Sequence, residues 1–286
     1  MLSEVPERWN RPIFMASLGR SGSTLLQRLL NVHPGITIWG EHGGFLKGVL
    51  QSYGDLSEPA TVTNLESGYE SRADVLGELE NKDSFKPWVS PFTAPIAKHA
   101  MANMVRSLFT AELDPTMRWG FKEIRYDAAQ ISPLMEMFPH AKVMILARDL
   151  RGHAQSRFFA FGNTNFDLTT DDGRAAAIVR LQNISKGWIE RYQGLLEASE
   201  RFEGRASIVA YNDLVVGSAR PAALFTELGE SPPAQGALDA VLEAVAGSSY
   251  KFNAAARENR EMLAALHEEA DVDWDEANRL SQILGV

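Results

Sequence analysis

Short apolar runs alternate with amphipathic segments along most of the chain. Four runs have the length of buried strands, 12–17, 36–39, 141–148 and 206–211, and the segment RWGFKE (118–123) is also expected to form a strand. Between the first two runs, leucines recur at helical spacing over TLLQRLLN. Strands that alternate with helices pair side by side in the same direction. The pattern therefore predicts an α/β fold, a three-layer sandwich with a central parallel sheet.

The remaining segments are expected to be mainly helical. Helical patterns cover 96–111, a segment ending at Met137, 151–160, 173–201 and most of 213–286, the last broken at Gly217, at 231–233 and around 247–253. From about 43 to 95 the pattern weakens, and we expect irregular structure with short helices there. Such a stretch is either a lid or acceptor-site wall or a surface insertion. The whole chain, 1–286, is interpreted as one domain.

Composition narrows the function classes. The chain has no cysteine, which excludes disulfides, thiolate catalysis and cysteine-ligated metals. Its net charge of -9 argues against a nucleic-acid partner. No apolar run approaches the ~20 residues of a membrane span, and the first residues lack the pattern of a signal peptide. We therefore expect a cytoplasmic protein; its oligomeric state is not readable from the sequence.

A glycine-rich turn follows the first strand and is typical of phosphate binding. It comprises Gly19, Arg20, Ser21, Gly22, Ser23 and Thr24. Glycines permit a tight backbone, and N–H groups at the start of the next helix can point at an anion. No lysine follows Gly22, and no strand ends in an aspartate placed to bind magnesium, so no metal site is predicted. The alternative is a plain strand-to-helix connection.

Two segments resemble one known family. The first is PIFMASLGRSGSTLLQRLLNVHP (12–34), similar to the 5′-phosphosulfate loop of sulfotransferases that depend on 3′-phosphoadenosine 5′-phosphosulfate (PAPS). It is nearest the tyrosylprotein sulfotransferase-like branch that includes many bacterial enzymes, with Gly19 in place of the usual proline. The second is VMILARDLRGHAQSR (143–157), similar to the family's 3′-phosphate segment, in which a serine lies eight residues after a strand-end arginine.

The resemblance implies a P-loop-like sulfotransferase fold that binds PAPS as co-substrate, with no metal. Arg148 and Ser156 match the family's 3′-phosphate ligands, and arginine suits this role because its planar group binds phosphate in a bidentate manner. Tyr211, in VAYNDLV, is a candidate neighbour of the nucleotide or an ordinary core residue. Ser249 and Lys251, in SSYKFN, are candidates for the loop that closes over the nucleotide, or solvated loop residues.

The resemblance also suggests catalytic residues. Glu41, in WGEHGG, is the candidate base, and His42 is its rival. Arg20 and Lys122 are the candidate cations beside the transferred group. Lys122 lies in WGFKE, which departs from the family's usual K-D-P ending, so its alternative role is a strand-end salt bridge with Glu123 or a neighbour.

The residues after Glu41 bear on the class of acceptor substrate. The family branch follows its base with an arginine that holds acidic peptides, whereas this chain has His42, Gly43 and Gly44. We therefore expect a small-molecule or carbohydrate acceptor: a hydroxyl of a sugar, a lipid head group or a small alcohol. Arg125, His99 and Trp88 are candidates for the acceptor pocket on residue type alone. The alternative functions are a P-loop kinase or NTPase-like phosphotransferase and a non-catalytic nucleotide-binding module.

Overall fold

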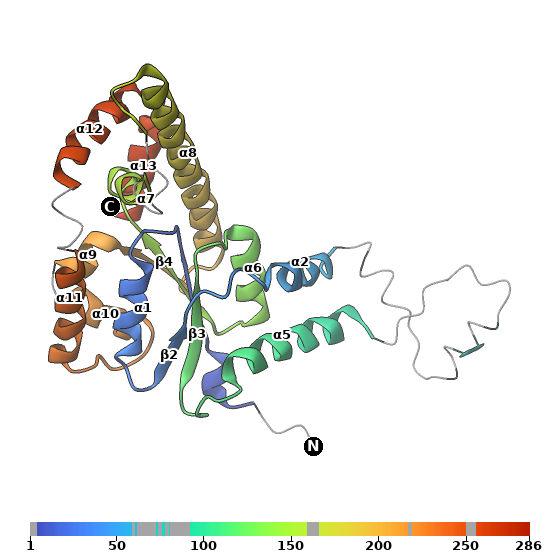
Figure 1. Cartoon of the computed structure of the whole chain (residues 1–286). Helices are drawn as coiled ribbons and strands as arrows, with labels where there is room; N and C mark the ends of the chain where they lie inside the picture. Colours follow the sequence, from blue (N-terminus) through green and yellow to red (C-terminus); the bar gives the residue numbers. More distant parts are fainter. Residues whose placement is uncertain are drawn as a thin grey trace.

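The sheet of the protein has five parallel strands with helices on both faces (Figure 1). The computed structural model describes residues 5–58, 92–158, 166–216, 219–249 and 256–286, with single positions at 61, 73, 76, 77 and 80. Within these ranges the side chains of 245–249 and 256–262 are not described. The strands are β1 (Ile13–Ser17), β2 (Ile36–Trp39), β3 (Arg118–Glu123), β4 (Lys142–Ala147) and β5 (Ala206–Ala210).

The strand order is β2-β3-β1-β4-β5, so β1 lies at the centre of the sheet. In the register, Met15 of β1 lies opposite Lys122 of β3 and Met144 of β4. The carboxyl ends of these three strands are therefore neighbours. In open parallel sheets this edge is where ligands bind. The glycine-rich turn follows β1, Arg148 follows β4, and Lys122 lies near the carboxyl end of β3.

Alternate residues of the strands pack into two separate apolar clusters. Phe14 and Ala16 face one cluster, while Ile13 and Met15 face the other. The first cluster is covered by α2 (Lys47–Asp55), α5 (Ala94–Thr110), α6 (Ala128–Met137), α7 (Leu150–Phe158), α8 (Asp171–Arg201), α12 (Ala256–Glu269) and α13 (Trp274–Leu284). The second is covered by α1 (Ser23–Asn31), α9 (Tyr211–Val215), α10 (Ala219–Glu227) and α11 (Gln235–Ser249). The predicted three-layer sandwich with a parallel sheet is confirmed.

Two features of the elements differ from the sequence prediction. β5 ends at Ala210, and Tyr211 begins α9 instead of ending the strand. A break unmarked in the prediction separates α12 from α13, because the Asp273 side chain accepts a hydrogen bond from the N–H of Glu276 and starts a new helix there. Within the stretch where the pattern weakens, α2 over Lys47–Asp55 is a short helix of the kind expected there. Most of 59–91 lies outside the described residues.

The first residue of β3, Arg118, is a buried cation that links segments distant in the sequence. Arg118 is 1% exposed and donates hydrogen bonds to the carbonyls of Arg11 and Leu228. It also pairs with Glu230, which accepts from Arg8 as well. Burial lowers the pKa of Arg118 to about 10, so it stays charged at neutral pH.

Among the described helices, none has the length and apolar character needed to cross a bilayer.

Candidate nucleotide and transfer site

The loop between β1 and α1 has the backbone of an anion-binding turn. Gly22 is the N-cap residue of α1 and has the left-handed conformation, with φ 94°. Arg20 also has a positive φ, 74°, and is the one non-glycine residue with this property in the described chain. A non-glycine residue in this region costs roughly 1–2 kcal/mol, and such strain gathers at functional sites. The first N–H groups of α1 have no acceptor within their own helix.

Tyr211 packs directly against this loop. A Cβ atom placed on Gly22 would lie 2.3 Å from Cδ2 and 2.5 Å from Cε2 of the Tyr211 ring. The loop therefore needs glycine here for two reasons, its left-handed backbone and this close approach. Tyr211 reaches the loop because it opens α9 at the end of β5. The sequence left its role open between nucleotide neighbour and core residue; its ring lies beside the loop.

Arg148 and Ser156 both contact the loop from the other motif. Arg148 follows β4, and its Cζ atom lies 4.6 Å from the centroid of the Tyr211 ring. Its Nη1 atom is 3.5 Å from the Arg20 carbonyl oxygen. Ser156 Oγ, on α7, accepts a hydrogen bond of 3.4 Å from Arg20 Nε. Four predicted site residues thus meet at one place, although they come from three distant segments of the chain.

Two serines of the loop point into the protein. Ser21 is fully buried, and its Oγ lies 3.5 Å from both His153 Nδ1 and the Tyr192 hydroxyl. Ser23 is also buried, whereas Thr24 is exposed. His153 was not predicted from the sequence. Burial, with the nearby charges of Arg157 and Arg148, lowers its pKa to about 4, so it is neutral at pH 7.

Glu41 and Lys122 form an ion pair beside the loop. Lys122 Nζ lies 3.1 Å from Glu41 Oε1 and donates a 3.2 Å hydrogen bond to Thr24 Oγ1. Lys122 is 6% exposed, so its amino group is held in position between β3 and α1. It pairs with Glu41 rather than with Glu123. The candidate base and one candidate cation are therefore in direct contact at the edge of the sheet.

Glu123 organises the loop that carries Glu41. It is fully buried and accepts hydrogen bonds from the N–H groups of Gly44 (2.9 Å) and His42 (3.3 Å). Arg125 Nη1 donates to Glu123 Oε1 at 2.9 Å and to Glu41 Oε2 at 3.3 Å. Burial acts to raise the pKa of Glu123, but the hydrogen bonds from Arg125 and Gly44 outweigh it and the net pKa is lowered. Ionised Glu123 thus holds the backbone of the loop at His42 and Gly44 in place.

His42, the rival base, lies among aromatic rings. Its ring centroid is 4.9 Å from that of Phe121, 5.0 Å from Phe45 and 5.4 Å from Tyr126. Its Nδ1 atom is buried, makes no hydrogen bond and lies 3.5 Å from Glu123 Oε2, and its Nε2 atom is 3.5 Å from the Tyr126 hydroxyl. Burial lowers the pKa of His42, although Glu123 acts in the opposite direction. This environment is that of a packed side chain.

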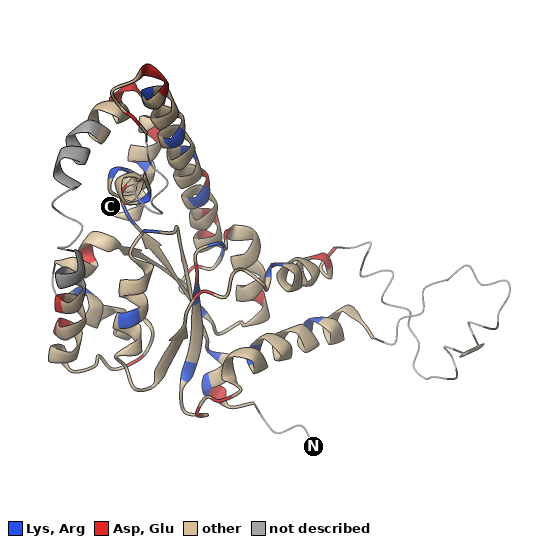
Figure 2. Cartoon of the chain, in the orientation of Figure 1, with Lys and Arg blue, Asp and Glu red and all other residues tan. Residues whose placement is uncertain are grey.

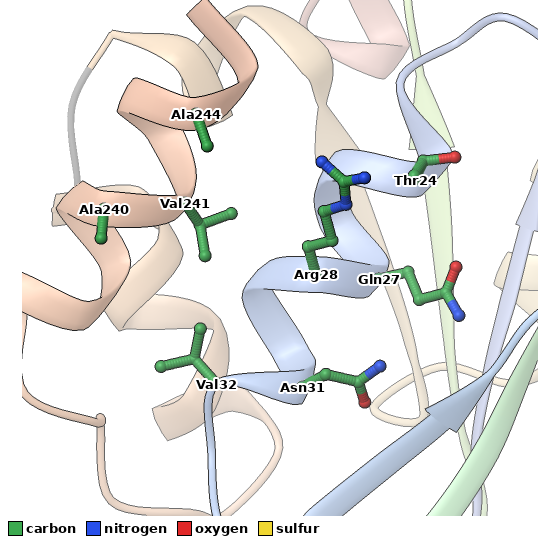
Figure 3. Close-up of a pocket in the computed structure, with 8 residues that line it drawn as sticks. All are labelled: Thr24, Gln27, Arg28, Asn31, Val32, Ala240, Val241 and Ala244. Atoms are coloured by element: carbon green, nitrogen blue, oxygen red, sulfur yellow. The ribbon is translucent and has the colours of Figure 1, made fainter. Parts of the chain in front are cut away.

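A hollow of about 490 Å³ lies between α1 and α11 (Figure 3). Val241 and Ala244 of α11 form one wall, and Arg28 of α1 stands on the facing wall. Gln27 and Asn31, also on α1, donate side-chain hydrogen bonds to the Ile38 carbonyl. The hollow meets the glycine-rich loop only at Thr24. The hollow is mainly apolar, and Thr24 is the one candidate phosphate ligand in its lining.

Several predicted residues remain apart from this cluster or undescribed. Gly19 borders the Arg157 guanidinium and the tip of Ile124. Ser249 is the last residue of α11 with its side chain undescribed, and Lys251 and Trp88 lie outside the described residues. His99 is exposed on α5. In the described part of the chain, no group of three or more His, Asp or Glu side chains is arranged to hold a metal ion.

Comparison with known proteins gives a family match. A family model described as "Sulfotransferase family" matches residues 12–221, more than two thirds of the chain. No curated protein sequence matches significantly. Among solved structures, the sulfotransferase domain of the Synechococcus PCC 7002 olefin synthase is similar, with 21% identity, a TM-score of 0.45 and coverage of 82% of this chain and 78% of that one.

Two further solved structures resemble the chain. A sulfotransferase from Alicyclobacillus acidocaldarius has 13% identity and a TM-score of 0.48, with 82% of this chain and 95% of that one covered. Sulfotransferase STF1 from Mycobacterium tuberculosis H37Rv has 15% identity and a TM-score of 0.42, with coverage of 80% and 70%.

Proposed function

The chain belongs to the sulfotransferase family, and on that premise we propose that it transfers a sulfuryl group from PAPS to an acceptor hydroxyl by in-line, metal-independent transfer. The convergence of Arg20, Arg148 and Ser156 around the loop supports this. Neither arginine has a carboxylate within 4 Å among the described residues. Two unpaired guanidinium groups beside a glycine-rich turn suit a ligand with separate phosphate groups.

The residues present fit such a ligand. Arg148 Nε is buried with no hydrogen-bond partner, so the side chain keeps a donor to spare. Arg148 and Ser156 would bind the 3′-phosphate, and the α1 N-terminus with Arg20 and Thr24 would bind the 5′-phosphosulfate. Tyr211 would lie against the nucleotide and fix the direction of Arg148. Bound PAPS supplies the activated sulfuryl group; the chain supplies position and charge.

Glu41 is proposed as the base and Lys122 as the cation of the transfer step. The acceptor oxygen attacks sulfur while its proton moves to a Glu41 oxygen, and the sulfur–oxygen bond to the 5′-phosphate breaks. Lys122, between Glu41 and Thr24, stabilises the charge that develops on the transferred group. Lys122 and Arg125 each contact one Glu41 oxygen, and each oxygen keeps a second acceptor position that can receive the proton.

The acceptor is proposed to be a small molecule with a hydroxyl group, from the sugar, lipid head-group or small-alcohol classes. The loop after Glu41 is His42, Gly43 and Gly44, so it provides no arginine for an acidic peptide.

Transfer of sulfur-35 from labelled PAPS, with EDTA present, tests the proposal. The chain is expected to label an acceptor in a small-molecule extract without added metal, and labelled γ-phosphate of ATP with magnesium should not be transferred. Phosphate transfer from ATP would favour the kinase alternative. Binding of 3′-phosphoadenosine 5′-phosphate (PAP) without transfer to any fraction would favour the non-catalytic module.

A further inference from the structure

A cavity of about 930 Å³ lies between α8 and the glycine-rich loop. Its walls come from the loop, the start of α2, the end of β3, α7 and α8. Leu18 and Gly19 contribute the loop side, and Arg125 contributes the β3 side. The cavity therefore opens beside the residues assigned to transfer, but on the face of the sheet opposite to α1 and α11.

The lining of this cavity is strongly basic. Its cations are Lys47, Arg125, Arg157, Arg180 and Arg191. No carboxylate lines it among the described residues. Figure 2 shows basic residues spaced along α8, which forms its long wall. The protein as a whole carries a net charge of -9, so this concentration of positive charge opposes the overall balance of the molecule.

Most of these cations have no ion-pair partner. Arg125 pairs with Glu41 and Glu123. The other four cations have no carboxylate within 4 Å in the described part of the chain. They are Lys47, Arg157, Arg180 and Arg191. Cations that repel one another without partners destabilise a fold. An anionic ligand in this cavity would supply the counter-charge that these side chains lack.

Two of the arginines are held in place by contacts that leave their charge unpaired. Arg180 donates to the Phe158 carbonyl at 3.2 Å, and its Cζ lies 5.5 Å and 6.0 Å from the centroids of Phe158 and Phe166. Its Nε atom is buried without a hydrogen-bond partner. Arg191 donates to the Tyr126 carbonyl. These guanidinium groups are therefore preorganised, which lowers the entropic cost of binding an anion.

Apolar side chains occupy the rest of the lining. Leu18, Ile124, Phe166, Val179 and Ile184 line the cavity between the cations. Val179 is 55% exposed although it is a large apolar residue. His153 also lines the cavity and adds no charge near neutral pH, since burial lowers its pKa to about 4. A ligand that fits this lining has an anionic group and an apolar portion.

We propose that the acceptor of this sulfotransferase is a small anion, with a carboxylate, phosphate or sulfate group next to an apolar portion, and that this cavity binds it. The inference rests on the proposed function. Gly19 connects the cavity to the loop, and Arg125 connects it to Glu41 through a contact of 3.3 Å. An acceptor anchored by Arg157 and Arg180 thus presents its hydroxyl toward the candidate base.

A matched pair of dyes tests the cavity without knowledge of the acceptor. 8-Anilinonaphthalene-1-sulfonate and N-phenyl-1-naphthylamine share an apolar body and differ by one sulfonate. With PAP saturating, fluorescence titration is expected to show at least tenfold tighter binding of the sulfonate. The double variant Lys47→Gln/Arg157→Gln changes two exposed cations and should lose at least tenfold of that affinity, with PAP and neutral-dye binding unchanged. Lys186→Gln, on α8 but outside the lining, is the matched control.

The result that overturns the proposal is equal affinity for the two dyes, or loss of sulfonate binding when PAP is added, which would place the cavity in the nucleotide site. Failure of PAP to bind at all, with the dye preference intact, would instead contradict the proposed function alone.

Transfer from sulfur-35 PAPS then identifies the source of the anion. Lipid and aqueous extracts of cells are each divided on an anion-exchange resin. Label is expected in a resin-retained fraction: the lipid fraction for an anionic lipid, the aqueous fraction for a soluble metabolite. If label appears only in compounds that the resin does not retain, the proposal is overturned. Transfer to those compounds by the Lys47→Gln/Arg157→Gln variant at the wild-type rate would confirm that result.

Discussion

Glu41 owes its role as candidate base to three neighbours supplied by β3 and the turn after it. Lys122 and Arg125 contact its two oxygens, and Glu123 holds the backbone of its loop through the N–H groups of His42 and Gly44. His42 is adjacent in sequence but directs its ring into the aromatic cluster. Glu41 therefore lies among polar side chains and His42 among aromatic rings. This difference favours Glu41 over His42 as the candidate base.

Replacement of Glu41 by glutamine should lower kcat for sulfuryl transfer by roughly 10²–10⁴-fold, because the acceptor proton loses its acceptor. Affinity for PAP, measured by calorimetry, should stay within about twofold of the wild type, since the change keeps the shape of the side chain. His42→Asn is the comparison variant and should retain most of kcat. The reverse pattern, in which His42→Asn abolishes transfer and Glu41→Gln does not, would make His42 the base.

The β1–loop–α1 element brings the two phosphate segments together. Its geometry depends on the left-handed Gly22 and on the ring of Tyr211 that covers it. Arg148 in turn packs on that ring, with its Cζ atom 4.6 Å from the ring centroid. The loop, the start of α9 and the end of β4 therefore form one packed unit, so a change in the loop is expected to alter the position of Arg148.

The variant Gly22→Ala should weaken PAP binding by more than tenfold, because its Cβ would displace the Tyr211 ring. Gly204→Ala provides the control: Gly204 also has a positive φ, 74°, but has open space around its Cβ position. It should cost only the backbone strain, roughly 1–2 kcal/mol of unfolding free energy, and leave PAP affinity unchanged. Calorimetry and urea unfolding measure the two effects. Equal PAP affinity in both variants would contradict the assigned role of the loop.

Local patterns along the chain predicted the elements well. The segments predicted as strands at 36–39 and 118–123 match β2 and β3 in full, although β3 carries the charged residues Arg118, Lys122 and Glu123. The α12–α13 break escaped prediction because it depends on one capping side chain, Asp273, in an otherwise helical pattern. The family motifs predicted the cluster of Arg20, Arg148 and Ser156.

What the sequence could not predict are contacts between distant segments. Glu123 has the same local setting as a surface salt-bridge residue, and its role depends on a loop 79 residues away. The basic cavity is similar: Lys47, Arg157 and Arg180 are each ordinary in their own segments, and only the packing of α8 against the loop brings them together.

The whole molecule keeps several ionisable groups buried near the sheet edge, and this links its stability to pH. His153 is 3% exposed and has a pKa of about 4, against about 6.5 in an unfolded chain. Between these values the unfolded state binds more protons than the folded state. The contribution of neutral His153 to stability is therefore fully present above pH 6.5 and is lost as the pH falls toward 4.

Replacement of His153 by glutamine should reduce this pH dependence. Between pH 7.5 and pH 5, the wild type is expected to lose about 2 kcal/mol more unfolding free energy than His153→Gln. Urea unfolding at the two pH values measures the difference. His140→Gln, at an exposed position, is the control and should behave as the wild type. Identical losses in wild type and His153→Gln would show that His153 is not protonated preferentially on unfolding.

The most direct test of the account is calorimetric binding of PAP, without metal, to the wild type and to Arg148→Ala, with ATP and magnesium as the comparison. The account predicts that the wild type binds PAP at least tenfold more tightly than ATP, and that Arg148→Ala loses more than about 1.4 kcal/mol of PAP binding, a factor of ten. Tighter binding of ATP with magnesium, or unchanged PAP affinity in Arg148→Ala, would contradict the 3′-phosphate assignment and the PAPS-dependent transfer built on it.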